Sequence, residues 1–92
     1  MKTKVIFRKE KEGVIAIFPY IIGSTAQKAV LCYSHNDQHS SCDYMEAVRL
    51  SKPASQTDAN ELLKELVFAV GYENIQVIKK ASLSKVYGQF YK

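Results

Sequence analysis

The segment from Ser55 to Gly71 carries the strongest folding signal in the chain, and any fold has to accommodate it. Ser55-Gln-Thr-Asp58 resembles a capping box in which Asp takes the place of Glu. Apolar residues then recur at helical spacing, and a glycine suited to end a helix follows them: Ala59, Leu62, Leu63, Leu66, Val70 and Gly71. The pattern predicts one amphipathic helix over residues 56–70, with Tyr72 packing back on its last turn.

An amphipathic helix needs a surface to cover, and the β-branched and aromatic residues on either side of it predict a sheet. We expect four strands, the first two joined as a hairpin at Gly13, over residues 3–9, 14–18, 28–34 and 75–79. Residues 42–50 fit a strand or a short helix, and we favour a strand because segment 28–34 is apolar on both faces and needs a neighbour. The predicted fold is α+β, a mainly antiparallel sheet in the order β-β-β-β-α-β with one helix packed on one face.

The chain of 92 residues is long enough for one domain, which we place at residues 1–80. Residues 81–92 form a basic and aromatic C-terminal tail that suits a docking helix, a homodimer contact or a frayed end. The sequence has no apolar run near the roughly 18 residues of a membrane span and no signal-peptide core. We therefore expect no membrane association, a cytoplasmic location and reduced thiols.

Positive charge is concentrated at the two ends of the chain. Residues 1–11 carry five bases against one acid, and residues 79–92 carry four bases and no acid, so each end has a net charge of +4. If the ends meet, they form a basic patch that attracts nucleic acid or an acidic protein, although lysines also serve simply to solvate a surface. Our leading hypothesis is a non-catalytic interaction module that binds such a macromolecule through Lys4, Arg8, Lys79, Lys80, Lys85 and Tyr87.

Both cysteines and both histidines lie within one short stretch, as Cys32-x2-His35-x3-His39-x2-Cys42. Two thiolates and two imidazoles suit tetrahedral Zn²⁺. Against a zinc site, all four residues belong to one loop without the glycine of a tight knuckle. The plainer interpretation makes Cys32 a core residue, Cys42 a strand-edge residue and the histidines turn residues. We predict no cofactor and keep the four residues as weak metal candidates.

The same stretch also offers the parts of a catalytic site. His35 and His39 suit general acid–base chemistry, with Asp37 or Asp43 to orient an imidazole, and either cysteine could act as a nucleophile. No recognised catalytic motif or phosphate-binding loop accompanies them. A metal-binding or histidine-dependent hydrolytic protein is therefore the alternative hypothesis.

Several short motifs carry a resemblance to a known family. They are Val-Ile-Phe-Arg-Lys near the start, Ala-Ile-Phe-Pro at 16–19, Cys-Tyr-Ser-His-Asn-Asp-Gln-His at 32–39, Asp-Tyr at 43–44, Lys-Pro-Ala at 52–54, Leu-Leu-Lys-Glu-Leu and Gly-Tyr at 71–72. Over roughly residues 3–80 the chain resembles a family of small uncharacterised proteins of gut-type anaerobic bacteria, their mobile elements and phages. The resemblance implies no activity. A cysteine at the place of Cys42 is not characteristic of that family, so the resemblance favours the histidines over a four-ligand site.

Overall fold

Four consecutive strands form an antiparallel meander in the computed structural model, which describes residues 2–91. A hairpin joins β1 to β2, and Gly13 in its turn has a φ of +139° that favours glycine. The next strand, β3, pairs with both β2 and β4 and is therefore interior, as the sequence predicts. The bounds are β1 Thr3–Glu10, β2 Gly13–Ser24, β3 Ala29–Ser34 and β4 Gln38–Cys42.

Two further short strands pair with the outer edge of β1. One is β5 (Lys52–Pro53), which runs antiparallel to β1, and the other is β6 (Ile75–Val77), which runs parallel to it. The sheet order is β4-β3-β2-β1-β5, with β6 also on β1. The sheet is therefore mainly antiparallel, as predicted, but it is mixed because the pairing of β1 with β6 is parallel. The pattern does not predict β5. The pairing of β1 with β6 places the start of the second basic segment, Lys79 and Lys80, near β1.

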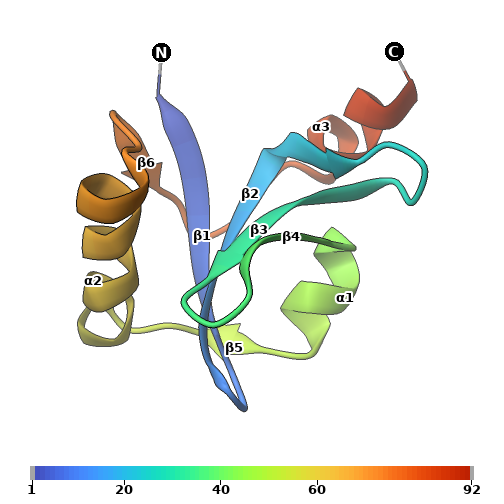
Figure 1. Cartoon of the computed structure of the whole chain (residues 1–92). Coiled ribbons are helices and arrows are strands. Elements are labelled where there is room, and N and C mark those ends of the chain that lie inside the picture. The colour runs from blue at the N-terminus through green and yellow to red at the C-terminus, as the bar shows by residue number, and fades with distance from the viewer. Residues whose placement is uncertain (1, 92) are drawn as a thin grey trace.

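Helices cover both faces of this sheet (Figure 1). One face is covered by α2 (Gln56–Lys64), which continues as a π-helix, η1 (Glu65–Val70). The other face carries α1 (Tyr44–Arg49) and α3 (Leu83–Gly88), the latter ending in a 3-10 turn, η2 (Gln89–Tyr91). The expectation of one helix on one face is thus too simple, because α1 and α3 add a second helical layer. No helix within residues 2–91 is long and apolar enough to cross a membrane.

The predicted helix over residues 56–70 is confirmed as α2 with η1. Its start is fixed by Ser55, whose hydroxyl accepts a hydrogen bond from the backbone N–H of Asp58 at 3.1 Å. Its end is fixed by Gly71, which has a φ of +100°. The N–H groups of Gly71 and Tyr72 both donate to the carbonyl of Leu66, at 3.0 and 2.9 Å.

The favoured strand over residues 42–50 is wrong, because this segment contains α1. Asp43 caps the helix by accepting from the N–H of Glu46 at 3.0 Å. The missing neighbour of β3 is β4, which pairs Tyr33 with His39 and Val30 with Cys42. This edge strand is polar and mostly exposed, so backbone pairing rather than an apolar face holds it in place.

The sheet is buried on both faces, and alternate strand residues feed two separate cores. The core under α2 contains Val5, Phe7, Ala16, Phe18, Tyr33, Ala59, Leu62 and Leu66. The core under α1 and α3 contains Ile6, Ile17, Val30, Cys32, Tyr44 and Val86. Because Val86 is fully buried and the Gln89 side chain donates to the carbonyl of Pro19, the C-terminal segment packs on the domain.

Candidate functional site

The β3–β4 hairpin brings both histidines toward the helical layer of α2 and η1. His39 lies opposite Tyr33 in the strand register, and their rings meet edge-on with 4.9 Å between centroids. His35 lies in the turn after β3, and 78% of its side chain is exposed. His35 contacts Glu65, while His39 Nε2 lies 2.9 Å from the hydroxyl of Tyr72. The two candidate histidines are therefore held by different partners.

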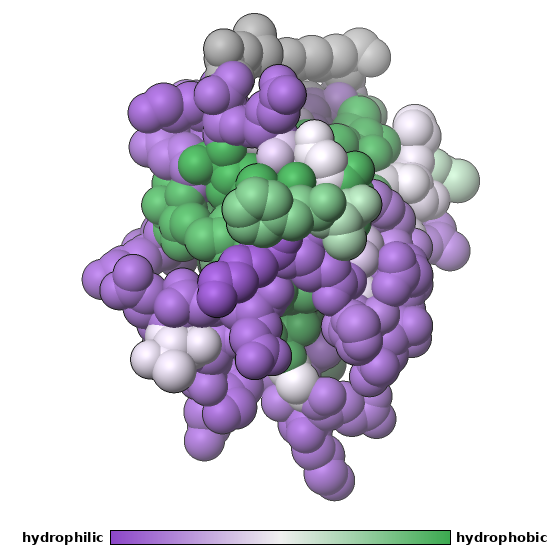
Figure 2. Space-filling view, turned by 60° about the vertical axis from the view of Figure 1, so that its left-hand side comes forward, coloured by the Kyte–Doolittle hydropathy of each residue, from purple (hydrophilic) through white to green (hydrophobic). Residues whose placement is uncertain are grey.

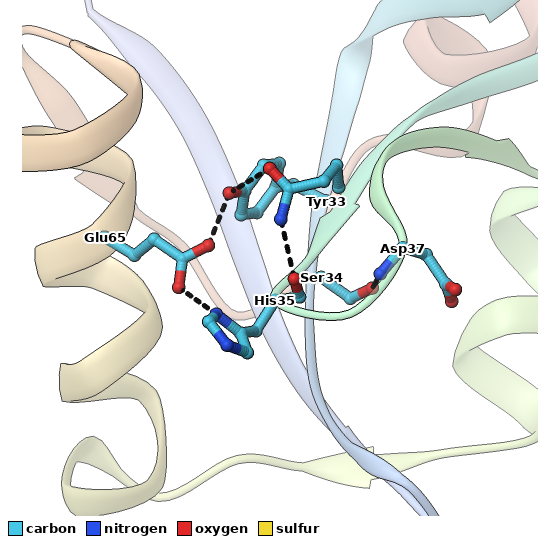
Figure 3. A network of polar contacts seen from close by, with 6 residues as sticks. Tyr33, Ser34, His35, Asp37 and Glu65 are labelled. Atoms are coloured by element: carbon cyan, nitrogen blue, oxygen red, sulfur yellow. Dashed lines mark hydrogen bonds and ion pairs between the residues drawn. The ribbon is translucent and has the colours of Figure 1, made fainter.

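Glu65, the first residue of η1, ties the hairpin to the helix (Figure 3). One oxygen of its carboxylate accepts a hydrogen bond from the Tyr33 hydroxyl, and the other lies 2.6 Å from Nδ1 of His35. The Tyr33 oxygen also lies 3.1 Å from Oε1 of Gln38, whose amide nitrogen donates to the carbonyl of His35 at 2.6 Å. A phenol has one hydrogen to donate, so the charged carboxylate takes it and the Gln38 contact is the weaker one.

This network shifts the pKa values of the two groups joined by the hydrogen bond, the Tyr33 hydroxyl and the Glu65 carboxyl. Donation by Tyr33, and next by His35, lowers the pKa of the Glu65 carboxyl. The same hydrogen bond, with burial second, raises the pKa of the Tyr33 hydroxyl. Near neutral pH the pair is therefore a neutral phenol and an ionised carboxylate, which is the state that this geometry stabilises.

The arrangement of Glu65 and His35 has the form of a carboxylate–imidazole pair. With Nδ1 held by the carboxylate, Nε2 of the exposed ring faces outward, where it can accept or donate a proton. The two acids that the sequence suggested for orienting an imidazole, Asp37 and Asp43, do not contact either histidine. Asp37 points away from the network in Figure 3, and Asp43 caps α1.

Sequence reasoning missed Glu65 because it is far from the histidines along the chain. The available signal was its position three residues after Leu62 and next to Leu66, which puts a carboxylate at the border of the apolar stripe. Such a border residue faces the sheet edge, where a polar partner is needed.

The two cysteines are joined by a disulfide, with 6.4 Å between their Cα atoms. This corrects the expectation of reduced thiols and removes Cys32 and Cys42 from the candidate metal ligands. Among the described residues no group of three or more histidine, cysteine or acidic side chains is arranged to hold a metal ion. A structural disulfide is typical of non-reducing compartments, so the predicted cytoplasmic location finds no support in it.

Two of the predicted partner-binding residues have structural tasks instead. Arg8 donates to the carbonyls of Val48 and Ser51 at 2.9 and 2.7 Å, and so anchors the C-terminal end of α1. Tyr87 donates to the carboxylate of Asp43 and accepts from the N–H of Met45, both at 3.2 Å, which fastens α3 to the start of α1. Neither side chain is available to a partner without loss of these contacts.

The predicted lysines remain at the surface. Lys4 lies on β1 with Nζ 5.7 Å from the centre of the Tyr20 ring, and Lys85 is exposed on α3. Lys79 and Lys80 are exposed directly after β6, and neither forms an ion pair with a described carboxylate. Of the predicted lysines in the C-terminal segment, Lys79 and Lys80 lie near β1 and Lys85 does not.

These two lysines line a groove of about 960 Å³ along the outer edge of β1. The groove exists because β5 pairs opposite Arg8 and β6 pairs as far as Val5, which leaves Ile6 and Phe7 between them. After β5 the chain continues into α2, and after β6 it continues toward α3 on the other face, so the two connections diverge there. We call this feature the β1-edge groove; three bases and no acid are found among its described lining residues.

A separate apolar area lies on the side of the molecule that carries α2. Figure 2 shows it as a hydrophobic band with polar surface around it. Exposed apolar side chains of η1 belong to this part of the fold, namely Val67, Phe68 and Val70. Phe68 is the most exposed of them, at 84%.

Comparisons with known proteins add no assignment to these sites. No family model matches the chain, and neither the curated proteins nor the solved structures contain a match.

Proposed function

We propose that this domain is a non-catalytic interaction module that binds an acidic macromolecular partner at the β1-edge groove. The observation that supports it is the parallel pairing of β1 with β6, which places Lys79 and Lys80 beside the basic first strand. Lys79 and Lys80 are exposed and form no ion pair with a described carboxylate, so they keep a positive potential that attracts an anionic surface. Arg8 adds a third positive charge from the groove wall while it anchors α1.

A charge-reversal experiment tests this proposal. The double variant Lys79→Glu/Lys80→Glu is compared with the control Lys11→Glu/Lys64→Glu, whose residues are exposed and do not line the groove. Binding to poly-L-glutamate and to single-stranded oligothymidylate is measured by fluorescence anisotropy at increasing salt. Removal and reversal of two exposed charges should weaken binding about tenfold, whereas the control should lose much less.

The salt dependence then separates the two partner classes. A nucleic-acid partner gives an affinity that falls steeply with salt, in proportion to the phosphates neutralised. An acidic protein gives a weaker dependence, mainly on the association rate. Equal losses in the groove variant and in the control would contradict the proposal, because binding would then follow net charge alone.

A second candidate function is favoured by the contact between His35 and Glu65. The Glu65 carboxylate, 2.6 Å from Nδ1 of His35, orients the imidazole so that Nε2 can transfer a proton, as hydrolytic chemistry requires. The ring is largely exposed, and the described groove lies along a different strand edge. Hydrolysis of an activated ester by the wild type and by His35→Ala tests this candidate, and equal rates would rule it out. A large loss in the variant would move the functional site to the hairpin.

A further inference from the structure

The β1-edge groove is lined mainly by apolar side chains, although its rim is basic. Residues from both faces of the sheet contribute, because the gap between β5 and β6 opens toward both helical layers. The apolar part of the lining consists largely of Ile6, Phe7, Val48, Leu63, Val77 and Ile78. A hollow of about 960 Å³ has room for more than one side chain of a ligand.

Strand addition does not suit this groove. The carbonyl of Val5 already accepts from the N–H of Ile78 at 2.9 Å, and the carbonyl of Phe7 accepts from the N–H of Ala54 at 3.3 Å. The edge of β1 therefore offers few backbone groups to an incoming strand, and recognition falls to side chains.

A nucleobase does not suit the groove either. Ser55, Gln56 and Asn60 could pair with only part of its hydrogen-bonding edge, because most of the lining is apolar. The polar groups left unpaired against apolar side chains are costly. A large apolar side chain has no such cost, and it gains from the burial of surfaces such as that of Val77, which is 54% exposed.

We propose that the β1-edge groove binds a protein segment in which a large apolar side chain is flanked by acidic residues. The apolar side chain enters the gap between β5 and β6, and the flanking carboxylates lie against Lys79 and Lys80 at the rim. This inference rests on the proposed function and narrows its partner to a protein. The charge complementarity is marked, since the described groove lining holds Arg8, Lys79 and Lys80 but no acid.

A displayed library of random peptides, selected on the immobilised full chain, tests the proposal. Enriched sequences should combine a phenylalanine, leucine or similar residue with neighbouring aspartate or glutamate. One enriched peptide is then synthesised with two matched versions, one with the apolar residue changed to alanine and one with the acids changed to amides. Loss of the anchor should weaken binding roughly tenfold to a hundredfold in calorimetry.

Variants of the protein locate the binding site. Asn60→Trp places a large ring at an exposed position of α2 that lines the groove, and it should remove the difference between the peptide and its alanine version. Thr57→Trp is the control, at an exposed position of α2 outside the groove lining, and it should preserve that difference. Thermal unfolding of both variants checks that they are folded.

The possible outcomes keep this inference and the proposed function apart. If binding depends on Lys79 and Lys80 but not on the apolar anchor, the inference fails and the proposed function stands. If binding depends on neither lysine, both fail. No enrichment over the bare support, equal effects of the two tryptophan variants, or oligothymidylate binding tighter than every selected peptide would each overturn the inference.

Discussion

Tyr33→Phe should lower the free energy of unfolding by about 2 kcal/mol near neutral pH. The Tyr33 ring is 2% exposed and packs in the core under α2, so phenylalanine keeps the packing and removes only the hydroxyl. A hydrogen bond to a charged group contributes about 1.5–3 kcal/mol net. The lower part of that range applies, because the Glu65 side chain keeps 20% exposure and its contact with His35.

The pH dependence of this loss follows from the two pKa shifts. Glu65 has a lowered pKa in the fold, so its contribution is full above the ordinary carboxyl value of about 4.3 and is lost as pH falls through the folded value. Tyr33 has a raised pKa, so its contribution is full below about 10 and is lost as pH rises through the folded value. The difference between wild type and Tyr33→Phe should therefore be largest between about pH 5 and 9 and shrink on both sides.

Urea unfolding across this pH range measures the effect. The control is Tyr91→Phe, which removes a hydroxyl from a ring that is 70% exposed, and it should change stability by less than about 0.5 kcal/mol. In a domain of this size, about 2 kcal/mol corresponds to a fall in Tm of roughly 8–16 °C. A loss below about 0.5 kcal/mol, or one that is equal at acid and neutral pH, would refute the assigned network.

Four further outcomes are expected. Leu66→Ala, at a fully buried position, should cost about 2–5 kcal/mol in denaturant titration, whereas Phe68→Ala, at an 84% exposed one, should cost under about 0.5. Gly71→Ala should cost about 1 kcal/mol by the same measurement, because its φ of +100° strains any residue with a Cβ. Replacing Cys32 and Cys42 by alanine together should cost roughly 2–3 kcal/mol, the value for a closed loop with a sequence separation of 10. A metal chelator should leave the thermal midpoint unchanged, since the cysteines are bonded to each other; a large fall would contradict the disulfide.

The sequence predicts the parts of the fold that are determined by residues close to them along the chain. The limits of α2 follow from Ser55 and Gly71, whose effects act within a turn. By contrast, β4 and β5 are short and polar, and they are strands only because β3 and β1 offer them backbone partners. Residues 44–49 form α1 rather than the predicted strand, because β4 supplies the neighbour that segment 28–34 needs and Asp43 caps a helix there.

The sequence predicts which residues are candidates for a site, but it does not predict which of them contact one another in the fold. The sequence indicates that His35 and His39 are unusual, yet it cannot indicate that Glu65, rather than a nearby aspartate, meets His35. Likewise, charge counting identifies the basic ends, while only the tertiary fold assigns Arg8 to α1 and leaves Lys79 beside the groove. Long-range packing decides which of several equivalent charges is left for a ligand.

The position of β1 also has a consequence for the order in which the chain is completed. Its three strand partners, β2, β5 and β6, come from different parts of the sequence, and β6 follows most of the other elements. The meander from β1 to β4 can form early because its contacts are local, whereas closure of the β1 edge waits for the last third of the chain. During synthesis on the ribosome, an emerging chain would therefore expose this edge of β1 until the residues of β6 have been made.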